Sequence, residues 1–232
     1  MKFYYDLHIH SGLSPCSDKD MTPANIAIAA GLSGLDFFAV SDHNSVKNSK
    51  VASICGEREG VVAVPALELQ TAEDIHMLCL FAELSGLFEF YGKLSFQSIR
   101  NRPKIFGQQF IYDEFNNIVD EEENLLIGSA DVSASEAFSL AFSLGGIALP
   151  AHIDRPSNGM EAILGAVPEE YSVVEISARA TPEFIKRYYD RLALYNSDAH
   201  YLAAIGSAGG SVDLAERSAE ALLNKLRAAL KR

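Results

Sequence analysis

The sequence predicts an α/β fold in which parallel strands alternate with helices, arranged either as a barrel or as a doubly wound sheet. Short apolar runs alternate with amphipathic segments along the chain, and this alternation favours a parallel sheet. The 232 residues suffice for one large domain with a sizeable core. A hydrophobic content of 48% with 22% charged residues is typical of a globular protein. We therefore expect one domain over residues 1–232.

The expected strands are the short apolar runs, and helices fill most of the segments between them. In chain order the strands are Phe3–Leu7, Phe37–Val40, Val61–Val64, Ile75–Phe81, Gly146–Leu149, Val173–Ile176 and Leu192–Tyr195. Two helices are expected to begin where a threonine precedes a proline, at Thr22 and at Thr181. Threonine is a good N-cap, and proline is favoured at the first helical position.

Two further helices have different start signals. Ser133 and Glu136 form a capping box ahead of an apolar-rich helix over Ala137–Leu144. Ser211 is the expected cap of the last helix. Apolar residues recur there at a helical period, at Ala215, Ala219, Leu222, Leu226 and Leu230.

The segment Phe88–Asn124 interrupts the alternation of strands and helices. It contains a basic group at Arg100, Arg102 and Lys104, and an acidic run at Asp120–Glu123. We interpret the segment as an insertion or lid near the functional site. A long surface connection with solvated charges is the alternative.

The net charge of −12 limits the classes of partner. An acidic surface repels phosphate backbones, so we do not expect nucleic acid or an anionic membrane as a partner. A small phosphorylated substrate is compatible, because bound cations would set the local field of a pocket. No stretch approaches the ~20 apolar residues that span a bilayer. Three cysteines without a short pair spacing argue against a disulfide framework, so we expect a cytoplasmic protein. The sequence does not indicate the oligomeric state.

All six histidines lie in sequence contexts that suit metal ligands. His8 and His10 are two residues apart on an expected strand, so both side chains point to the same face of the sheet. Hydrogen-bonded core histidines are the alternative, but each would need its own buried partner. Further candidates follow other expected strands: Asp42, His43, Glu68, His76, His152, Asp198 and His200.

Taken together, these residues predict a multinuclear metal site at the carboxyl ends of the strands, where α/β folds collect catalytic groups. Glu68 could bridge two cations, as carboxylates do in binuclear hydrolases. Imidazole and carboxylate ligands suit Zn, Mn or Fe without choosing among them. Metals of this kind generate a hydroxide nucleophile from water and neutralise charge on substrate oxygens.

The motifs resemble the polymerase and histidinol phosphatase (PHP) family. They are Asp6-Leu-His8-Ile-His10-Ser11, Val40-Ser-Asp42-His43-Asn44, Glu68 with His76, Pro150-Ala-His152, and Asn196-Ser-Asp198-Ala-His200. They run in the family's order over nearly the whole chain. The resemblance implies a distorted seven-stranded (β/α) barrel with a trinuclear metal site. It also implies hydrolysis of a phosphoester, typically a phosphomonoester.

The resemblance also implies a division of the ligands among two to three divalent metal ions. The first metal would be held by His8, His10, Glu68 and Asp198, and the second by Glu68, His76 and His152. His43 and His200 would hold the third, with Asp42 as a direct ligand or as a residue that orients one. A hydroxide between the first two metals would attack phosphorus.

The sequence departs from the family at the third metal. The family places Asp or His seven or eight residues after the first histidine, where this chain has Pro15 and Cys16. Cys16 could be a thiolate ligand that favours zinc, or Asp18 or Asp20 could reach in instead. Surface loop positions are the alternative for both aspartates.

Two arginines are candidate substrate-binding residues. Arg155 resembles a family arginine that grips the substrate's phosphate, a task that suits the planar guanidinium. Arg179 follows the strand that ends near Ser177 and is a second candidate. We expect Arg155, Asp198 and His43 to take part in catalysis. The expected function is metal-dependent hydrolysis of a small sugar, amino-alcohol or nucleotide phosphate. The alternatives are a nuclease that acts on nucleic-acid ends and a non-catalytic module stabilised by metal.

Overall fold

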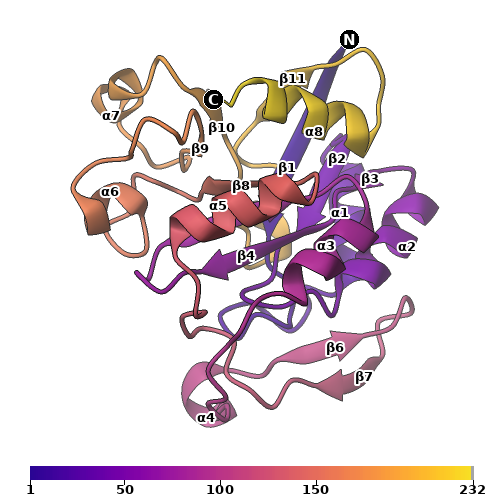
Figure 1. Ribbon diagram of the computed structural model, residues 1–232. Helices are drawn as coiled ribbons and strands as arrows, with labels where there is room; N and C mark the ends of the chain where they lie inside the picture. Colours follow the sequence, from indigo (N-terminus) through magenta and orange to yellow (C-terminus); the bar gives the residue numbers. More distant parts are fainter. Residues whose placement is uncertain (231–232) are drawn as a thin grey trace.

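The computed structural model describes residues 1–230. A four-stranded sheet has the order β11-β1-β2-β3 (Figure 1). Its central strands β1 (Lys2–Ile9) and β2 (Phe37–Val40) run parallel, as does the short β3 (Val62–Ala63). The edge strand β11 (Gly210–Asp213) pairs antiparallel with β1.

Three smaller sheets complete the strands. An antiparallel sheet contains β4 (Ala66–Gln70), β5 (His76–Leu80) and β8 (Ile147–Pro150). A parallel pair joins β9 (Val173–Glu175) to β10 (Leu192–Leu194). A hairpin pairs β6 (Phe110–Tyr112) with β7 (Ile118–Glu121).

Single contacts connect these sheets at the ends of their strands. A parallel bridge joins His43 to Glu68, and another joins Ile9 to Ala199. The third contact is a hydrogen bond of 2.9 Å from the Ile153 N–H to the Glu175 carbonyl. The expected α/β class is therefore confirmed, with mixed sheets. No continuous ladder closes the sheets of residues 1–230 into the expected seven-stranded barrel, because neighbouring strands of different sheets meet at one residue each.

Eight helices cover the sheets within residues 1–230. Five have two or more turns: α1 (Pro23–Leu32), α2 (Ser49–Glu59), α3 (Leu84–Tyr91), α5 (Ala134–Ser143) and α8 (Ala219–Ala228). The shorter ones are α4 (Pro103–Phe106), α6 (Met160–Leu164) and α7 (Pro182–Arg187), and a 3₁₀ turn spans Leu202–Ala204. None of the helices in this described range is long and apolar enough to cross a membrane.

The expected helix starts are confirmed at three positions. The Thr22 hydroxyl accepts from the Asn25 N–H, and Thr181 accepts from the Phe184 N–H. Ser133 and Glu136 form both bonds of a capping box. These signals were readable because an N-cap depends only on residues two or three positions away.

The expected cap of the last helix was wrong. Ser211 lies in β11, and α8 begins after Ser218, whose hydroxyl accepts from the Ala221 N–H. Pairing with β1 keeps residues 210–213 extended. Gly210 permits this pairing, because a Cβ there would lie 2.5 Å from a ring carbon of Tyr5.

The expected strand over Val61–Val64 is also divided differently. Only Val62 and Ala63 pair with β2, and Glu68 lies in a separate strand, β4. Pro65 separates the two strands because proline has no N–H to donate to a ladder. This break moves the chain from the four-stranded sheet to the three-stranded one.

The insertion is defined here as the segment between α3 and α5, residues 92–133. The expected boundary at Phe88 was early, since Phe88 belongs to α3. The insertion carries α4 and the β6–β7 hairpin, which lie together at one side of the body in Figure 1. A two-stranded hairpin is marginally stable alone, so its position depends on contacts with the body.

Candidate metal centre

The six histidines meet at the ends of β1, β2, β5 and β8 and in the loop after β10. Their neighbouring rings form a nearly closed circuit. His10 lies between His43 and His200, with ring centroids 4.4 and 4.5 Å away. The other neighbouring pairs are His8–His10, His43–His76, His76–His152 and His8–His152, at 5.1, 5.1, 5.3 and 5.8 Å. The structure thus brings together all six histidines singled out from the sequence.

Glu68 lies at the middle of this group and is 1% exposed. Its Oε1 lies 2.8 Å from His76 Nδ1 and 3.0 Å from His152 Nε2. Its Oε2 lies 2.8 Å from His43 Nδ1 and 3.3 Å from His10 Nε2. The β4–β5 register and the bridge to His43 fix this position. One carboxylate therefore contacts imidazoles from four different segments.

Asp198 closes the other side of the group. Its Oδ1 lies 3.0 Å from His10 Nε2 and 3.5 Å from His8 Nε2, while its Oδ2 lies 2.6 Å from an Arg155 nitrogen. Asp198 and His152 both have a positive φ, 49° and 30°. Such a backbone is costly for residues with a Cβ and persists where the surroundings enforce it. Strain is thus concentrated at two of the converging residues.

Several buried polar atoms in this group lack a hydrogen-bond partner. They are His43 Nδ1, Glu68 Oε2, His152 Nδ1 and Asp198 Oδ1. His43 Nδ1 and Glu68 Oε2 are 2.8 Å apart, but they do not align as donor and acceptor. Leaving such an atom unsatisfied costs about 1–3 kcal/mol. Divalent cations would satisfy His43 Nδ1, Glu68 Oε2 and Asp198 Oδ1, so this donor set fits a metal centre.

Three groups of donor atoms each lie within 4.8 Å of one another. They are His8, His10 and Asp198; His43, Glu68 and His76; and His10, His43 and His200. Imidazole and carboxylate donors of this kind suit Zn, Mn or Fe. The clusters can therefore hold metal ions.

The carboxylates of the centre raise the pKa values of three histidines. Burial lowers the pKa of His8, but Glu175, Glu68 and Asp198 outweigh it and raise that pKa well above 6.5. Against the same burial, carboxylates raise the pKa of His10 and of His43 to about 9. The histidines in turn hold the carboxyl pKa of Glu68 and of Asp198 well below its usual range, although burial opposes this. Without metal, the centre therefore holds protons on several imidazoles at neutral pH.

At two other histidines, burial outweighs the carboxylates, and the net pKa shift is downward. Burial lowers the pKa of His200 to about 4, and the cationic His10 beside it adds to the effect. Burial also lowers the pKa of His76 below its ordinary value. These two imidazoles are therefore neutral at pH 7, the form in which imidazole binds a metal.

A buried carboxylate orients His8. Glu175, on β9, is fully buried, and its oxygens lie 2.9 and 3.1 Å from His8 Nδ1. A carboxylate only accepts, so Nδ1 carries a proton and Nε2 is the nitrogen that faces the centre. The Asn196 side chain donates to Glu175 and accepts from the Leu7 N–H. The sequence interpretation missed Glu175, although a charge inside the apolar run Val173–Ile176 is a signal that a partner exists.

A hydroxyl orients His10. Ser14 Oγ lies 2.9 Å from His10 Nδ1, donates to Asp42 Oδ1 at 2.7 Å and accepts from the His43 N–H. Its single proton goes to the carboxylate, so His10 Nδ1 must donate and Nε2 faces the centre. Asp42 also accepts from the backbone and hydroxyl of Ser11. These bonds favour the orienting role for Asp42 over direct ligation.

The remaining candidate ligands lie at the edge of the centre. Cys16 is exposed and lines the cavity of about 190 Å³ above the histidines. Its hydrogen bond contributes to the raised pKa of His43. Asp18 and Asp20 are exposed, and neither is among the residues that line this cavity. Their surface alternative is therefore the better interpretation.

The two candidate arginines lie at different distances from the centre. Arg155 lines the cavity above the histidines and also an adjoining groove of about 640 Å³. Arg179 lines only the groove, together with Tyr201, which is 56% exposed. The first arginine is thus next to the metal-ligand candidates, and the second is beside the path that leads away from them.

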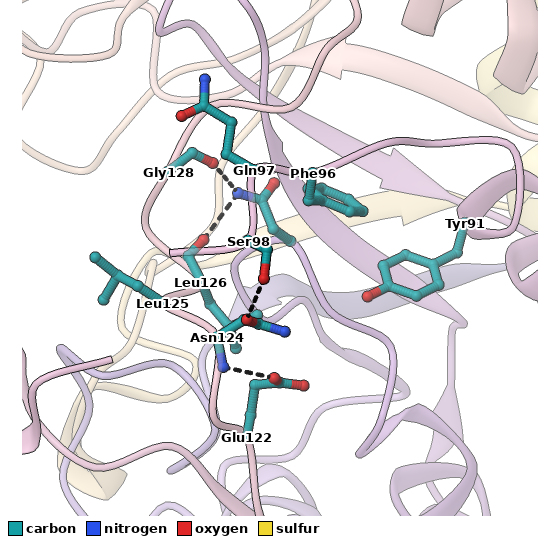
Figure 2. A pocket seen from close by; sticks show the side chains of 10 residues that line it. Tyr91, Phe96, Gln97, Ser98, Glu122, Asn124, Leu125, Leu126 and Gly128 are labelled. Atoms are coloured by element: carbon teal, nitrogen blue, oxygen red, sulfur yellow. Dashed lines mark hydrogen bonds between the residues drawn. The ribbon is translucent and has the colours of Figure 1, made fainter. Parts of the chain in front are cut away.

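The insertion packs beside the centre. The residues that line the cavity above the histidines include none from 92–133. A pocket of about 130 Å³ separates part of the insertion from the body, and Figure 2 shows Tyr91, Phe96 and Asn124 around it. The Asn44 side chain donates to the Leu126 and Gly128 carbonyls at this pocket. The insertion is thus attached to the residue that follows His43.

Comparisons with known proteins identify the fold. No protein-family profile matches the chain, and no curated protein sequence matches it. Solved structures do match. Endonuclease Q from Pyrococcus furiosus, a lesion-specific endonuclease, has a TM-score of 0.65 at 21% identity. The match covers 98% of this chain and 56% of that one, so the chain spans a little over half the length of Endonuclease Q.

Two neighbours match along nearly their whole length. A protein from Bifidobacterium adolescentis described as a metal-dependent phosphoesterase has a TM-score of 0.57 at 16% identity, over 98% of this chain and 96% of that one. An amidohydrolase from Chromobacterium violaceum with bound sulfate has a TM-score of 0.61 at 16% identity, over 98% and 97%. At such identities the likeness shows a shared fold.

One neighbour corrects the expectation that nucleic acid is not a partner. A second Endonuclease Q structure, with a TM-score of 0.66 at 20% identity over 98% of this chain and 57% of that one, holds a 27-mer duplex substrate with an abasic lesion at its active site. The net charge of −12 was therefore a poor guide. Net charge sums over the whole surface, whereas bound cations and nearby arginines set the field at a site.

Proposed function

We propose that the chain is a metal-dependent phosphoesterase related to the PHP family. The observation that carries this proposal is the convergence of six histidines on Glu68 and Asp198, with buried polar atoms left unpartnered. A centre of this composition is costly to bury unless cations complete it. The fold shared with a metal-dependent phosphoesterase and with Endonuclease Q supports the same reaction class.

We assign the ligands as the sequence motifs imply. His8, His10, Glu68 and Asp198 would hold the first metal, and Glu68, His76 and His152 the second. The convergence of His8, His10 and Asp198, and of Glu68 with His76, supports these sets. His43 and His200 would belong to the third, together with His10 or the Cys16 thiolate at the cavity wall. Asp42 would orient His10 through Ser14.

The chain's own residues would prepare the substrate and the ligands. When bound, divalent metals would make water more acidic and neutralise charge on the substrate's oxygens. Arg155 would bind phosphate oxygens at the cavity, leaving its ion pair with Asp198 to do so. Glu175 and Ser14 would keep the protons of His8 and His10 on Nδ1, directing both Nε2 atoms inward.

We also infer that the strands around the centre act as an interrupted seven-stranded barrel within a single domain. In spatial order they would be β1, β2, β4, β5, β8, β9 and β10. The bridges His43–Glu68 and Ile9–Ala199 and the bond between Ile153 and Glu175 support this order. The breaks between ladders would leave room for the ligands.

A small phosphomonoester is the first candidate substrate. The cavity of about 190 Å³ above the histidines is smaller than the ~300–1,000 Å³ usual for ligand pockets. A phosphoryl group would occupy it, with the rest of the substrate in the adjoining groove. A phosphodiester at a nucleic-acid end or lesion is the second candidate, favoured by the fold shared with Endonuclease Q and by the groove of about 640 Å³ beside the cavity.

Turnover tests this proposal. Phosphate release would be measured from a panel of small phosphomonoesters, in parallel with cleavage of 5′- and 3′-labelled strands and an abasic duplex. We expect metal-dependent turnover of either the phosphomonoesters or the nucleic-acid substrates. This turnover should be lost in His8→Ala and Asp198→Ala. Fully metallated protein with no turnover on any arm would contradict the proposal and favour a non-catalytic metal-stabilised module.

A further inference from the structure

The insertion contacts the loop that carries the metal-ligand candidates of β1. The Phe110 N–H donates to the Gly12 carbonyl at 2.8 Å, and the Tyr112 hydroxyl donates to the Lys19 carbonyl at 2.9 Å. Gly12 has no side chain at this contact, and an added Cβ would lie 2.2 Å from the Tyr112 hydroxyl. Strand β6 therefore lies directly against the residues that follow His10.

Asn48 is the side chain that joins β6 to this loop. It is fully buried, and its amide group makes three hydrogen bonds. Nδ2 donates to Ser11 Oγ at 2.8 Å and to the Phe110 carbonyl at 3.2 Å, and Oδ1 accepts from the Tyr112 N–H at 3.1 Å. Asparagine at an N-cap ordinarily bonds to the first turn of its helix. Asn48 occupies the N-cap of α2 without such a bond, so its amide serves the insertion contact instead.

The bonds continue from Asn48 to the His10 ring, and each step has a defined direction. Asn48 donates to Ser11 Oγ, so the Ser11 hydroxyl proton is directed to Asp42 Oδ2, 2.6 Å away. Asp42 Oδ1 accepts the proton of the Ser14 hydroxyl, which leaves Ser14 to accept from His10 Nδ1. The side chains in this series are all buried. Between Asn48 and His10, each hydroxyl therefore has a single orientation that satisfies its partners on both sides.

We propose that Asn48 is a positioning residue that couples the docked insertion to His10, so that the insertion tunes the metal affinity of the His10 side of the centre. The inference rests on the proposed function only in assuming a metal centre. Removing the amide would free the Ser11 hydroxyl to rotate and weaken the hold of Asp42 on Ser14. His10 would then lose the fixed orientation of its Nε2. Residues that orient metal ligands in this way typically contribute 10–100-fold to metal affinity.

Gln109 offers a matched control within the insertion. It is also a fully buried amide with three hydrogen bonds. Its Nε2 donates to the carbonyls of Glu122 and Asn124, and its Oε1 accepts from the Leu126 N–H. These bonds lie inside the insertion and do not reach Ser11. Asn48→Ala and Gln109→Ala therefore remove the same kind of group from opposite sides of β6.

The test measures the metal affinity of the whole chain by competition with a chromophoric chelator, using Zn²⁺ or Mn²⁺, together with Tm. We expect Asn48→Ala to weaken one metal equivalent by up to about tenfold, the lower end of this range, because Asn48 acts on His10 through Ser11, Asp42 and Ser14. Gln109→Ala should lower Tm while changing the metal affinity by less than about twofold. Turnover of Asn48→Ala should return as free metal is raised, which a misfolded site would not allow.

A second variant keeps the inference testable if Asn48→Ala does not fold. Ser11→Ala removes the next link and leaves the bonds of Asn48 to β6, and it should weaken the same metal equivalent. Wild-type affinity in both Asn48→Ala and Ser11→Ala would overturn the inference. An equal loss of affinity in Gln109→Ala would also overturn it, since any loosening of the insertion would then suffice. Wild-type protein that binds metal without any turnover would instead contradict the proposed function and leave the coupling supported by the affinities.

Discussion

His8 and His10 lie two residues apart on one strand and face the same centre, yet different regions of the molecule orient them. A fully buried carboxylate of the strand core, Glu175, accepts from His8. A serine hydroxyl in a loop accepts from His10 and leads through Asp42 toward the insertion. The core thus orients one ligand with a carboxylate in direct contact, and a loop orients the other with a neutral hydroxyl. Changes in the loops can therefore alter one side of the centre and leave the other side intact.

The largest loss of metal affinity should come from removing the carboxylate that orients His8. Glu175→Gln keeps the size of the side chain but removes the charge that makes His8 a better ligand. We expect metal affinity to fall by up to about 100-fold, measured by chelator competition. Asp154→Asn is the control, because Asp154 bonds to the backbone and hydroxyl of Ser177 and has no contact with a histidine. Equal metal affinity in Glu175→Gln and wild type would contradict the role of Glu175.

Raising the pH should strengthen metal binding by the centre. His10 and His43 have pKa values raised to about 9, so a metal must displace their protons at neutral pH. Each displaced proton changes affinity by about tenfold per pH unit. Titration by calorimetry between pH 7 and pH 9 should therefore show affinity rising with pH and protons released on binding. A flat profile would contradict the presence of protonated imidazoles in the metal-free centre.

The same shifts predict how metal-free protein responds to pH. A folded-state pKa above the unfolded value of about 6.5 stabilises the fold fully below that value, and the stabilisation is lost as pH rises through about 9. The Tm of metal-free protein should fall over this range. The Tm of metal-bound protein should not follow it, because the metal has already displaced the protons.

A smaller loss of metal affinity is expected from removing the hydroxyl that orients His10. Ser14→Ala removes the acceptor for His10 Nδ1 and one of the bonds to Asp42. We expect metal affinity to fall by about tenfold, toward the lower end of the range for orienting residues. Ser41→Ala is a matched control, since Ser41 is a buried serine that contacts the backbone of Ile9 and no imidazole. A larger loss in Ser14→Ala than in Glu175→Gln would reverse the comparison between the two ligands.

The smallest effect should come from displacing the insertion. Gly12→Ala would place a Cβ against the Tyr112 hydroxyl and push β6 outward, at a cost of about 1–3 kcal/mol in stability. Metal affinity should fall about threefold, because Asn48 would keep part of its contacts. Tyr112→Phe combined with Gly12→Ala should restore part of the stability by removing the clashing oxygen, while the bond to the Lys19 carbonyl stays lost. Failure of that rescue would contradict the contact between the loop and β6.

Local signals in the sequence predicted the convergence of the histidines and three of the four expected helix starts. Spacing alone placed His8 and His10 on one face of a strand, and the caps at Thr22, Thr181 and Ser133 depend on neighbouring residues. The structure brings the predicted histidines together with Glu68 and Asp198. These features could be read because each depends on a few consecutive residues.

Features that depend on distant segments could not be read in this way. Glu175 reaches His8 across 167 positions, and Asn48 meets Tyr112 across 64. Ser211 was expected to cap the last helix because its pairing with Tyr4, at the opposite end of the chain, leaves no local signal in the sequence. The expected closed barrel likewise depended on ladders between sheets, where the structure has single bridges. Net charge was not sufficient to exclude nucleic acid as a partner for a similar reason, since it carries no information about where charges lie.

The most direct test of the metal centre is the number of metal ions per chain after reconstitution with Zn, Mn or Fe and removal of the excess. Elemental analysis should find two to three divalent ions per folded chain, falling in His8→Ala and Asp198→Ala. Folded wild-type protein that retains no metal under these conditions would contradict the metal centre. The convergence of the histidines on Glu68 would then require a different explanation.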